Sequence, residues 1–211
     1  MATITEQEAI PSVQPSPSAV TGWVPANPAP LGLMGFGLTT LVLSFVNANI
    51  VGGGAASFPI VLGMAAAFGG TVQLLAGMWE FRTGNTFGAV AFSSFGAFWL
   101  SFFILVMFNV SQLVSGDAKE INSLLGLYLW SWGIFTGLLF LCTFASPRAL
   151  QLLFLLLTVT FIFLGIGNSG ANTSMIHVGG YVGIATAAVA MYIAVADIMQ
   201  AVYKRAVLPV G

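Results

Sequence analysis

Six apolar segments, each of about 20 residues, dominate this chain, and that is the length at which a helix crosses the roughly 30 Å hydrocarbon core of a bilayer. The segments occupy residues 29–51, 59–81, 86–110, 121–144, 149–167 and 175–203. Backbone N–H and C=O groups cannot remain unpaired in lipid, so each segment is expected to be an α-helix. The pattern predicts an all-α membrane protein with six transmembrane helices per protomer.

Charged side chains are too few for a soluble protein of this length. Only 5% of the 211 residues are charged, 58% are hydrophobic, and the mean hydropathy is +0.98. The net charge of −1 gives no sign of a nucleic-acid partner. The connections between the apolar segments are short, so none of them can hold a soluble catalytic domain.

The basic residues predict the orientation of the chain. Residues 1–26 are rich in Pro, Ser and Thr and contain no Lys or Arg, so we expect a disordered cytoplasmic tail. A six-helix transport domain would follow over 27–204, and a short tail over 205–211. With the N-terminus inside, four of the five basic residues are cytoplasmic and only Lys119 is outside. We therefore expect a multi-pass protein of the inner or plasma membrane with both termini in the cytoplasm.

The first apolar segment opens with an unusual motif, "NPAPLGLMGFG" at 27–37. Asn27 is a favourable helix N-cap, and Pro28 would then take the first helical position. Pro30 still lies in the first turn, where backbone N–H groups have no intrahelical partner to lose. The positive dipole end of such a helix can attract an anion at the cytoplasmic mouth. The alternative is a well-formed helix start whose glycines serve packing only.

Neutral polar residues at membrane depth are a second signal. Phe36, Thr40 and Asn47 follow one stripe of the first helix. Gln73 lies on a face with Gly69 and Gly77, and lipid exposure would penalise its amide. Each of these residues alone could form a helix–helix hydrogen bond. Together in one small bundle, they favour a shared polar path.

The charged residues near helix ends are interpreted differently. Glu80 with Arg82, and Asp197 with Lys204, lie where side chains reach the interface easily, so we expect structural or topological roles for them. His177 begins the sixth segment; it is a candidate pH sensor, with an interfacial hydrogen-bonded histidine as the alternative. With one His and one Cys, no His/Cys metal site can form. We expect no cofactor, no metal and no enzymatic activity, since no catalytic set or nucleotide-binding loop is visible.

Several stretches together resemble the acetate uptake transporter family, the succinate–acetate permeases. The stretches are "NPAPLGLMGFGLTT" at 27–40, "EFRTGNTFG" at 80–88, "FGAFWL" at 95–100, "YLWSWGIFT" at 128–136, "LTVTFIFLGIGN" at 157–168, "IHVGGYVG" at 176–183 and "RAVLPVG" at 205–211. The family signature at the helix start comprises Asn27, Pro28, Ala29, Pro30, Leu31, Gly32 and Leu33. The resemblance covers residues 26 to 211 in order.

This resemblance implies a six-helix protomer with its own pore, assembled into a homo-hexameric ring in the lipid bilayer. It implies transport of acetate and, in some members, succinate. The family's pore constriction maps to Phe36, Phe95 and Leu157. The second aromatic of this constriction is often Tyr, so Phe95 leaves the predicted gate drier.

Physical chemistry adds a constraint on how a small carboxylate crosses such a protein. A bare carboxylate in hydrocarbon is prohibitively costly, yet no Lys or Arg falls in the middle of any of the six segments. Neutral donors must then solvate the substrate. With a carboxyl pKa near 4, about one acid molecule in a thousand is neutral at pH 7. Passage as the acid, or with a proton, would avoid full charge burial; the sequence leaves both proton symport and an anion channel open.

Two other functions remain possible from the sequence. One is a channel for a small neutral solute such as urea or ammonia, because its lining would also be uncharged. The other is a membrane scaffold or sensor without transport, for which the short loops offer little surface to a soluble partner.

Overall fold

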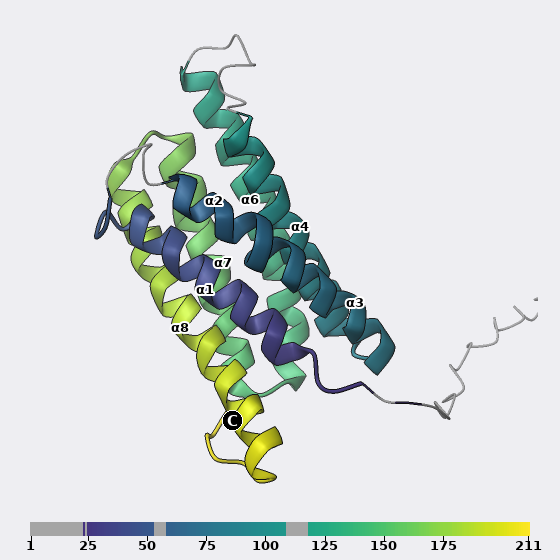
Figure 1. Ribbon diagram of the computed structural model, residues 1–211. Helices are drawn as coiled ribbons and strands as arrows, with labels where there is room; N and C mark the ends of the chain where they lie inside the picture. Colours follow the sequence, from purple (N-terminus) through teal and green to yellow (C-terminus); the bar gives the residue numbers. More distant parts are fainter. Residues whose placement is uncertain (1–22, 24, 53–57, 109–117) are drawn as a thin grey trace, which may run out of the picture.

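The computed structural model describes residues 23, 25–52, 58–108 and 118–211, and the part of the chain that it describes is helical throughout its regular structure. The predicted disordered tail at 1–26 lies almost wholly outside these residues. The helices are α1 (Ala29–Asn47), α2 (Phe58–Ala66), α3 (Gln73–Thr83), α4 (Thr86–Met107), α6 (Ala118–Cys142), α7 (Arg148–Ser169) and α8 (Thr173–Tyr203) (Figure 1). A π-helical turn, η2 (Ala67–Val72), joins α2 to α3, and a 3₁₀ turn, η3 (Thr143–Ala145), ends α6.

Six helical stretches are long and apolar enough to cross a membrane, which confirms the predicted six-helix architecture. They are Ala29–Asn47, Pro59–Thr83, Thr86–Met107, Lys119–Ala145, Arg148–Ser169 and Thr173–Tyr203. The second span combines α2, η2 and α3 into one continuous crossing. The first span is shorter than the predicted 29–51, because Asn49 adopts a left-handed backbone conformation with φ of 56° and ends the helix.

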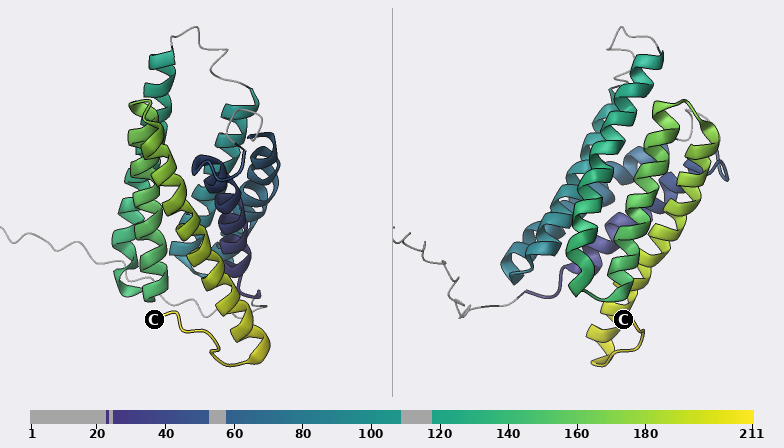
Figure 2. Two further views of the ribbon diagram at one scale, coloured as in Figure 1. Left: turned by 90° about the vertical axis from the view of Figure 1, so that its left-hand side faces the viewer. Right: turned by 180° about the vertical axis from the view of Figure 1, so that it is seen from behind.

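The helices pack in a chain of neighbours. α1 lies along α8, α8 along α7, and α7 along α6 (Figures 1 and 2). α3 packs against α4, and the second span contacts α1 mainly through η2 and α3. α1, α4 and α7 all begin at the end of the bundle where α3 and α8 finish, drawn at the bottom of Figure 1. We call this end of the bundle the mouth end.

The last residues fold back across the mouth end. Lys204 takes a left-handed conformation with φ of 57° at the C-cap of α8, and the chain then reverses toward the start of α7 (Figure 2). The hydroxyl of Tyr192 donates to the carbonyl of Pro209 over 2.6 Å. The backbone N–H of Ala149 donates to the carbonyl of Val210 over 2.9 Å. We refer to residues 206–211 as the C-terminal strap.

Candidate functional site

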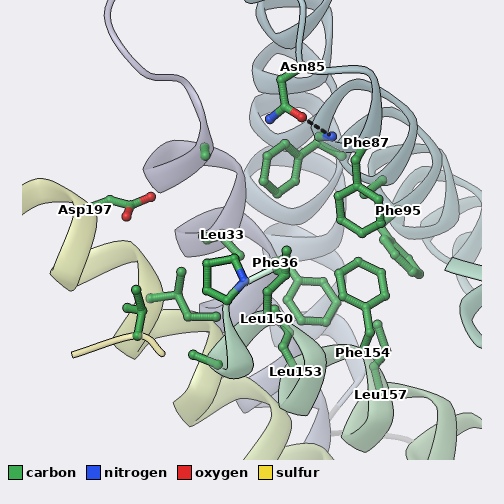
Figure 3. A pocket seen from close by; sticks show the side chains of 18 residues that line it. Leu33, Phe36, Asn85, Phe87, Phe95, Leu150, Leu153, Phe154, Leu157 and Asp197 are labelled. Atoms are coloured by element: carbon green, nitrogen blue, oxygen red, sulfur yellow. Dashed lines mark hydrogen bonds between the residues drawn. The ribbon is translucent and has the colours of Figure 1, made fainter. Parts of the chain in front are cut away.

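A cavity of about 190 Å³ opens between α1, α4, α7 and α8 at the mouth end (Figure 3). Its walls are mostly apolar and carry side chains such as Leu33, Phe92 and Phe154. Asn85, Asp197 and Val210 lie among the residues that line it nearest the mouth end. The cavity therefore enters the bundle from one end and meets polar groups only at its entrance.

Phe36, Phe95 and Leu157, the residues that the family resemblance placed at a constriction, lie together in the cavity wall. All three are buried, and the ring centroids of Phe36 and Phe95 are 5.8 Å apart at an interplanar angle of 54°. They come seven to nine residues after the starts of α1, α4 and α7. At about 1.5 Å per helical residue, the three side chains share a depth of roughly 10 to 14 Å from those helix starts.

The rings around Phe95 hold it in place. Its ring centroid lies 6.1 Å from that of Trp132 and 5.8 Å from that of Phe135, both on α6, and 6.3 Å from that of Phe154 on α7. Such tilted and edge-to-face pairs fix the orientation of a ring as well as burying its surface. Together with Phe36 on α1, these rings fix the position of Phe95 from three neighbouring helices, α1, α6 and α7. Its role as a gate stays a prediction.

Buried hydroxyls follow about one helical turn or more beyond this ring. Thr40 and Ser44 on α1, Thr160 on α7 and Thr186 on α8 are all buried. The hydroxyl oxygens of Thr160 and Thr186 are 3.2 Å apart. The hydroxyl of Thr40 has no hydrogen-bond partner among the described residues. These are neutral groups that can donate or accept, as expected for a path that binds a carboxyl group without a cation.

The structure corrects the predicted capping of the first helix by one residue. The carbonyl of Pro28 accepts the first helical bonds, from Leu31 and Gly32, so Pro28 and not Asn27 is the N-cap residue, and Pro30 falls within the first turn. The side chain of Asn27 still accepts a hydrogen bond from the N–H of Ala29, over 3.0 Å. Pro28 at the N-cap and Pro30 in the first turn both restrict the backbone at the helix start. The side-chain amide of Asn27 satisfies a free N–H from one position further out.

Within the signature, some residues point into the bundle and others do not. Ala29 and Leu33 line the cavity, whereas Leu31 is exposed. Gly32 lies beneath the ring of Phe92, whose atoms would be 2.7 to 2.9 Å from a Cβ at that position. Only glycine permits this approach of α1 to α4, which explains one of the glycines in the opening motif.

Asp197 lies in the cavity wall, although its place near the end of α8 predicted a structural or topological role. It extends from α8 toward the start of α1 (Figure 3), and its carboxylate accepts a hydrogen bond of 3.5 Å from the Asn27 amide. Among the described residues, it is the only ionisable side chain that lines the cavity. The sequence did not reveal this because α8 continues past the other helices, so a position near its end still faces the bundle.

Glu80 is also inside the protein, although its place near a helix end predicted a side chain that reaches the interface. Its side chain is only 1% exposed, and one carboxylate oxygen accepts a hydrogen bond from the Thr83 hydroxyl over 3.1 Å. Its carboxyl carbon would lie 2.9 Å from a Cβ at Gly88, which lines the cavity, so the carboxyl group sits directly behind the wall. Arg82 instead donates to the backbone carbonyl of Trp23 over 3.5 Å.

The other predicted path residues do not line the cavity. Gln73 is 1% exposed and packs where α3 meets α1. Its Cβ would lie 3.5 Å from a Cβ placed on Gly35. Its side-chain carbonyl oxygen has no hydrogen-bond partner among the described residues. Asn47 is half-buried at the far end of α1, and His177 is half-buried early in α8. Both are remote from the mouth end, so their roles stay predictions.

Comparison with known proteins agrees with this architecture. The sequence matches the GPR1/FUN34/yaaH family over residues 10–210. It is 42% identical over 186 residues to the succinate-acetate/proton symporter SatP of Escherichia coli, covering 88% of this chain and 95% of that protein. It is 42% identical over 199 residues to acetate permease A of Emericella nidulans, covering 88% of this chain and 66% of that protein. A solved structure of the bacterial acetate channel SatP superposes with a TM-score of 0.81 at 40% identity, covering 89% of this chain and 99% of that chain.

Proposed function

The chain belongs to the GPR1/FUN34/yaaH family, and we propose that it is a membrane transporter, without enzymatic activity, that carries acetate and related small monocarboxylates. The observation that carries the proposal is the cavity at the mouth end, whose wall includes Phe36, Phe95 and Leu157. The names of the relatives support the substrate class: one is a succinate-acetate/proton symporter, one an acetate permease and one an acetate channel.

The geometry supports a path along the axis of one protomer. A substrate entering at the mouth end would meet an apolar ring and then the hydroxyls of Thr40 and Thr160. Narrow apolar rings gate by excluding water and ions. A monocarboxylate can present its methyl group to the rings, whereas a dicarboxylate must bring a second polar end through the same ring. We therefore propose a preference for acetate over succinate.

The proposal includes the setting of the protein. We place the mouth end and both termini in the cytoplasm, in the inner or plasma membrane, on the charge bias of the short loops. We also propose a homo-hexamer. The exposed apolar side chains on α6, which include Leu127, Ile134 and Leu138, supply surface that lipid or neighbouring protomers would cover. Native mass spectrometry in mild detergent that detects only monomers would contradict the hexamer.

The decisive experiment is uptake of labelled acetate into proteoliposomes by the wild-type protein and by Leu157→Ala. Shortening the side chain at the constriction should raise acetate flux, because the apolar ring becomes wider. Leu155→Ala is the matched control, since Leu155 lies on the same helix with 42% of its side chain exposed and does not line the cavity. Wild-type uptake equal to that of protein-free liposomes would refute acetate transport; equal flux in the two variants would place the constriction elsewhere.

Competition separates this function from the neutral-solute alternative. Excess unlabelled acetate should suppress uptake of the labelled acid, whereas excess urea should leave it unchanged. Suppression by urea alone would favour a small neutral-solute channel.

A further inference from the structure

The entrance of the cavity holds a carboxylate where a transporter of anions would be expected to hold a cation. Asp197 lines the cavity, and its hydrogen-bond partner is the neutral amide of Asn27. No ion pair to Asp197 forms within the described ranges of the chain. A substrate carboxyl group that reaches the cavity therefore meets a second carboxyl group and no compensating positive side chain.

The charged groups around Asp197 do not remove this problem. Glu80 on α3 is nearly fully buried and lies close enough to interact electrostatically with Asp197. Its carboxylate carries the same negative charge as Asp197 and cannot compensate it. Arg82, on the same helix, is turned toward the carbonyl of Trp23. Arg148 at the start of α7 is exposed beside Gly211, and Lys204 and Arg205, which follow α8, are exposed as well.

Helix dipoles do not supply a dominant positive charge either. α1, α4 and α7 begin at the mouth end and α3, α6 and α8 end there. Each terminus carries a partial charge of about half an elementary charge, positive at a start and negative at an end, so the contributions largely cancel over this face of the bundle. The full charge of a carboxylate in the wall therefore determines the local field.

Two carboxyl groups confined in one apolar site repel each other when both are ionised, and they relieve this repulsion by sharing a single proton. We infer that Asp197 and the substrate carboxyl group form such a one-proton pair in the cavity, so that each monocarboxylate enters with one proton. This inference rests on the proposed acetate transport and names the residue that couples it to protons. No covalent bond is made: the proton moves with the substrate, and Asp197 remains in the wall with its charge unchanged.

Electroneutral transport follows from this pairing. An acetate ion that travels with a proton moves no net charge, whereas an acetate ion that travels alone carries a current. Asp197→Asn keeps the shape of the side chain and an oxygen that can accept from Asn27, but it removes the group that shares the proton. Transport by this variant should become electrogenic.

The test combines labelled acetate flux with current measurement on the full-length protein in proteoliposomes and planar bilayers at pH 7.5. We expect the wild type to show acetate flux above protein-free membranes without an acetate-dependent current. We expect Asp197→Asn to carry a current whose reversal potential shifts by about 59 mV for each tenfold acetate gradient, the value for one charge per acetate. Glu120→Gln, which removes one acidic charge at the start of α6, should behave as the wild type.

Each outcome has a definite consequence. A wild type that carries one charge per acetate, or an Asp197→Asn variant whose flux stays electroneutral, overturns the inference while acetate transport stands. If Asp197→Asn is inactive, Asp197→Glu decides: retained electroneutral flux supports the need for a carboxyl group, and loss of flux in both variants overturns it in favour of packing. Absence of wild-type flux refutes acetate transport itself.

Discussion

The C-terminal strap should limit entry into the cavity, and Tyr192→Phe tests this directly. The hydroxyl of Tyr192 donates a hydrogen bond of 2.6 Å to the carbonyl of Pro209. The next residue, Val210, lines the cavity. Removing one hydrogen bond of this kind changes stability by about 1 kcal/mol. If only the attached state of the strap is stabilised by that bond, the fraction of detached strap rises about fivefold. Acetate flux should rise by up to the same factor, about fivefold, if detachment opens the entrance.

Two measurements check this reasoning. Hydrogen exchange at the N–H of Ala149, which is bonded to the Val210 carbonyl over 2.9 Å, reports detachment of the strap, and labelled acetate flux reports the entrance. Tyr181→Phe is the control, because Tyr181 is on the same helix and 57% exposed, away from the strap. Faster exchange at Ala149 with unchanged flux would show that the strap detaches without gating entry, and the reasoning would fail.

Three further substitutions test the constriction, the α1–α3 seam and the helix contacts. Phe95→Tyr should raise the ratio of succinate flux to acetate flux by about fivefold, the effect of one added hydrogen bond of about 1 kcal/mol; an unchanged ratio in paired uptake assays would remove Phe95 from the selectivity step. Gln73→Leu removes a buried oxygen that has no partner in the described part of the chain, so melting temperature should hold or rise and acetate flux should change by less than about twofold; a large loss of flux at unchanged melting temperature would restore Gln73 to the path. Gly183→Ala should lower stability by about 1 to 3 kcal/mol, because its Cβ would collide with the Ser44 side chain; denaturation at wild-type temperature would show that α1 and α8 can separate there without penalty.

The six spans were predictable because the bilayer imposes both their length and their helicity. Hydropathy alone gave the second span, 59–81, close to the observed Pro59–Thr83. It could not reveal the π-helical turn at Ala67–Val72, since that turn depends on how Gly69 and Gly70 pack against α1 and α4. Local backbone geometry of this kind is set by tertiary contacts that hydrophobicity does not encode.

The constriction was placed by resemblance, and the acidic residues were misjudged for a physical reason. The position of a residue relative to a helix end indicates how far its side chain is from water along the membrane normal. It does not say whether the side chain faces lipid, solvent or a neighbouring helix. Glu80 and Asp197 both lie near ends and both face inward. The hydroxyls of Ser44, Thr160 and Thr186 were missed because serine and threonine are common in membrane helices, where they bond to their own backbone, as Thr160 does with the Leu156 carbonyl.

The order of groups along the proposed path explains how one protein can use both a carboxylate and an apolar ring. If the apolar ring at Phe36 and Phe95 forms the predicted gate, it is the step at which a net charge is most costly. A proton shared with Asp197 at the entrance neutralises the substrate before it reaches that ring. The hydroxyl of Thr40 beyond the ring accepts or donates equally well, so it can bind the acid without selecting its charge state. Along this path, the charge of the substrate therefore has to be selected before its shape. The positions of the residues agree with that order, because Asp197 lies at the mouth of the cavity and the aromatic rings lie deeper in it.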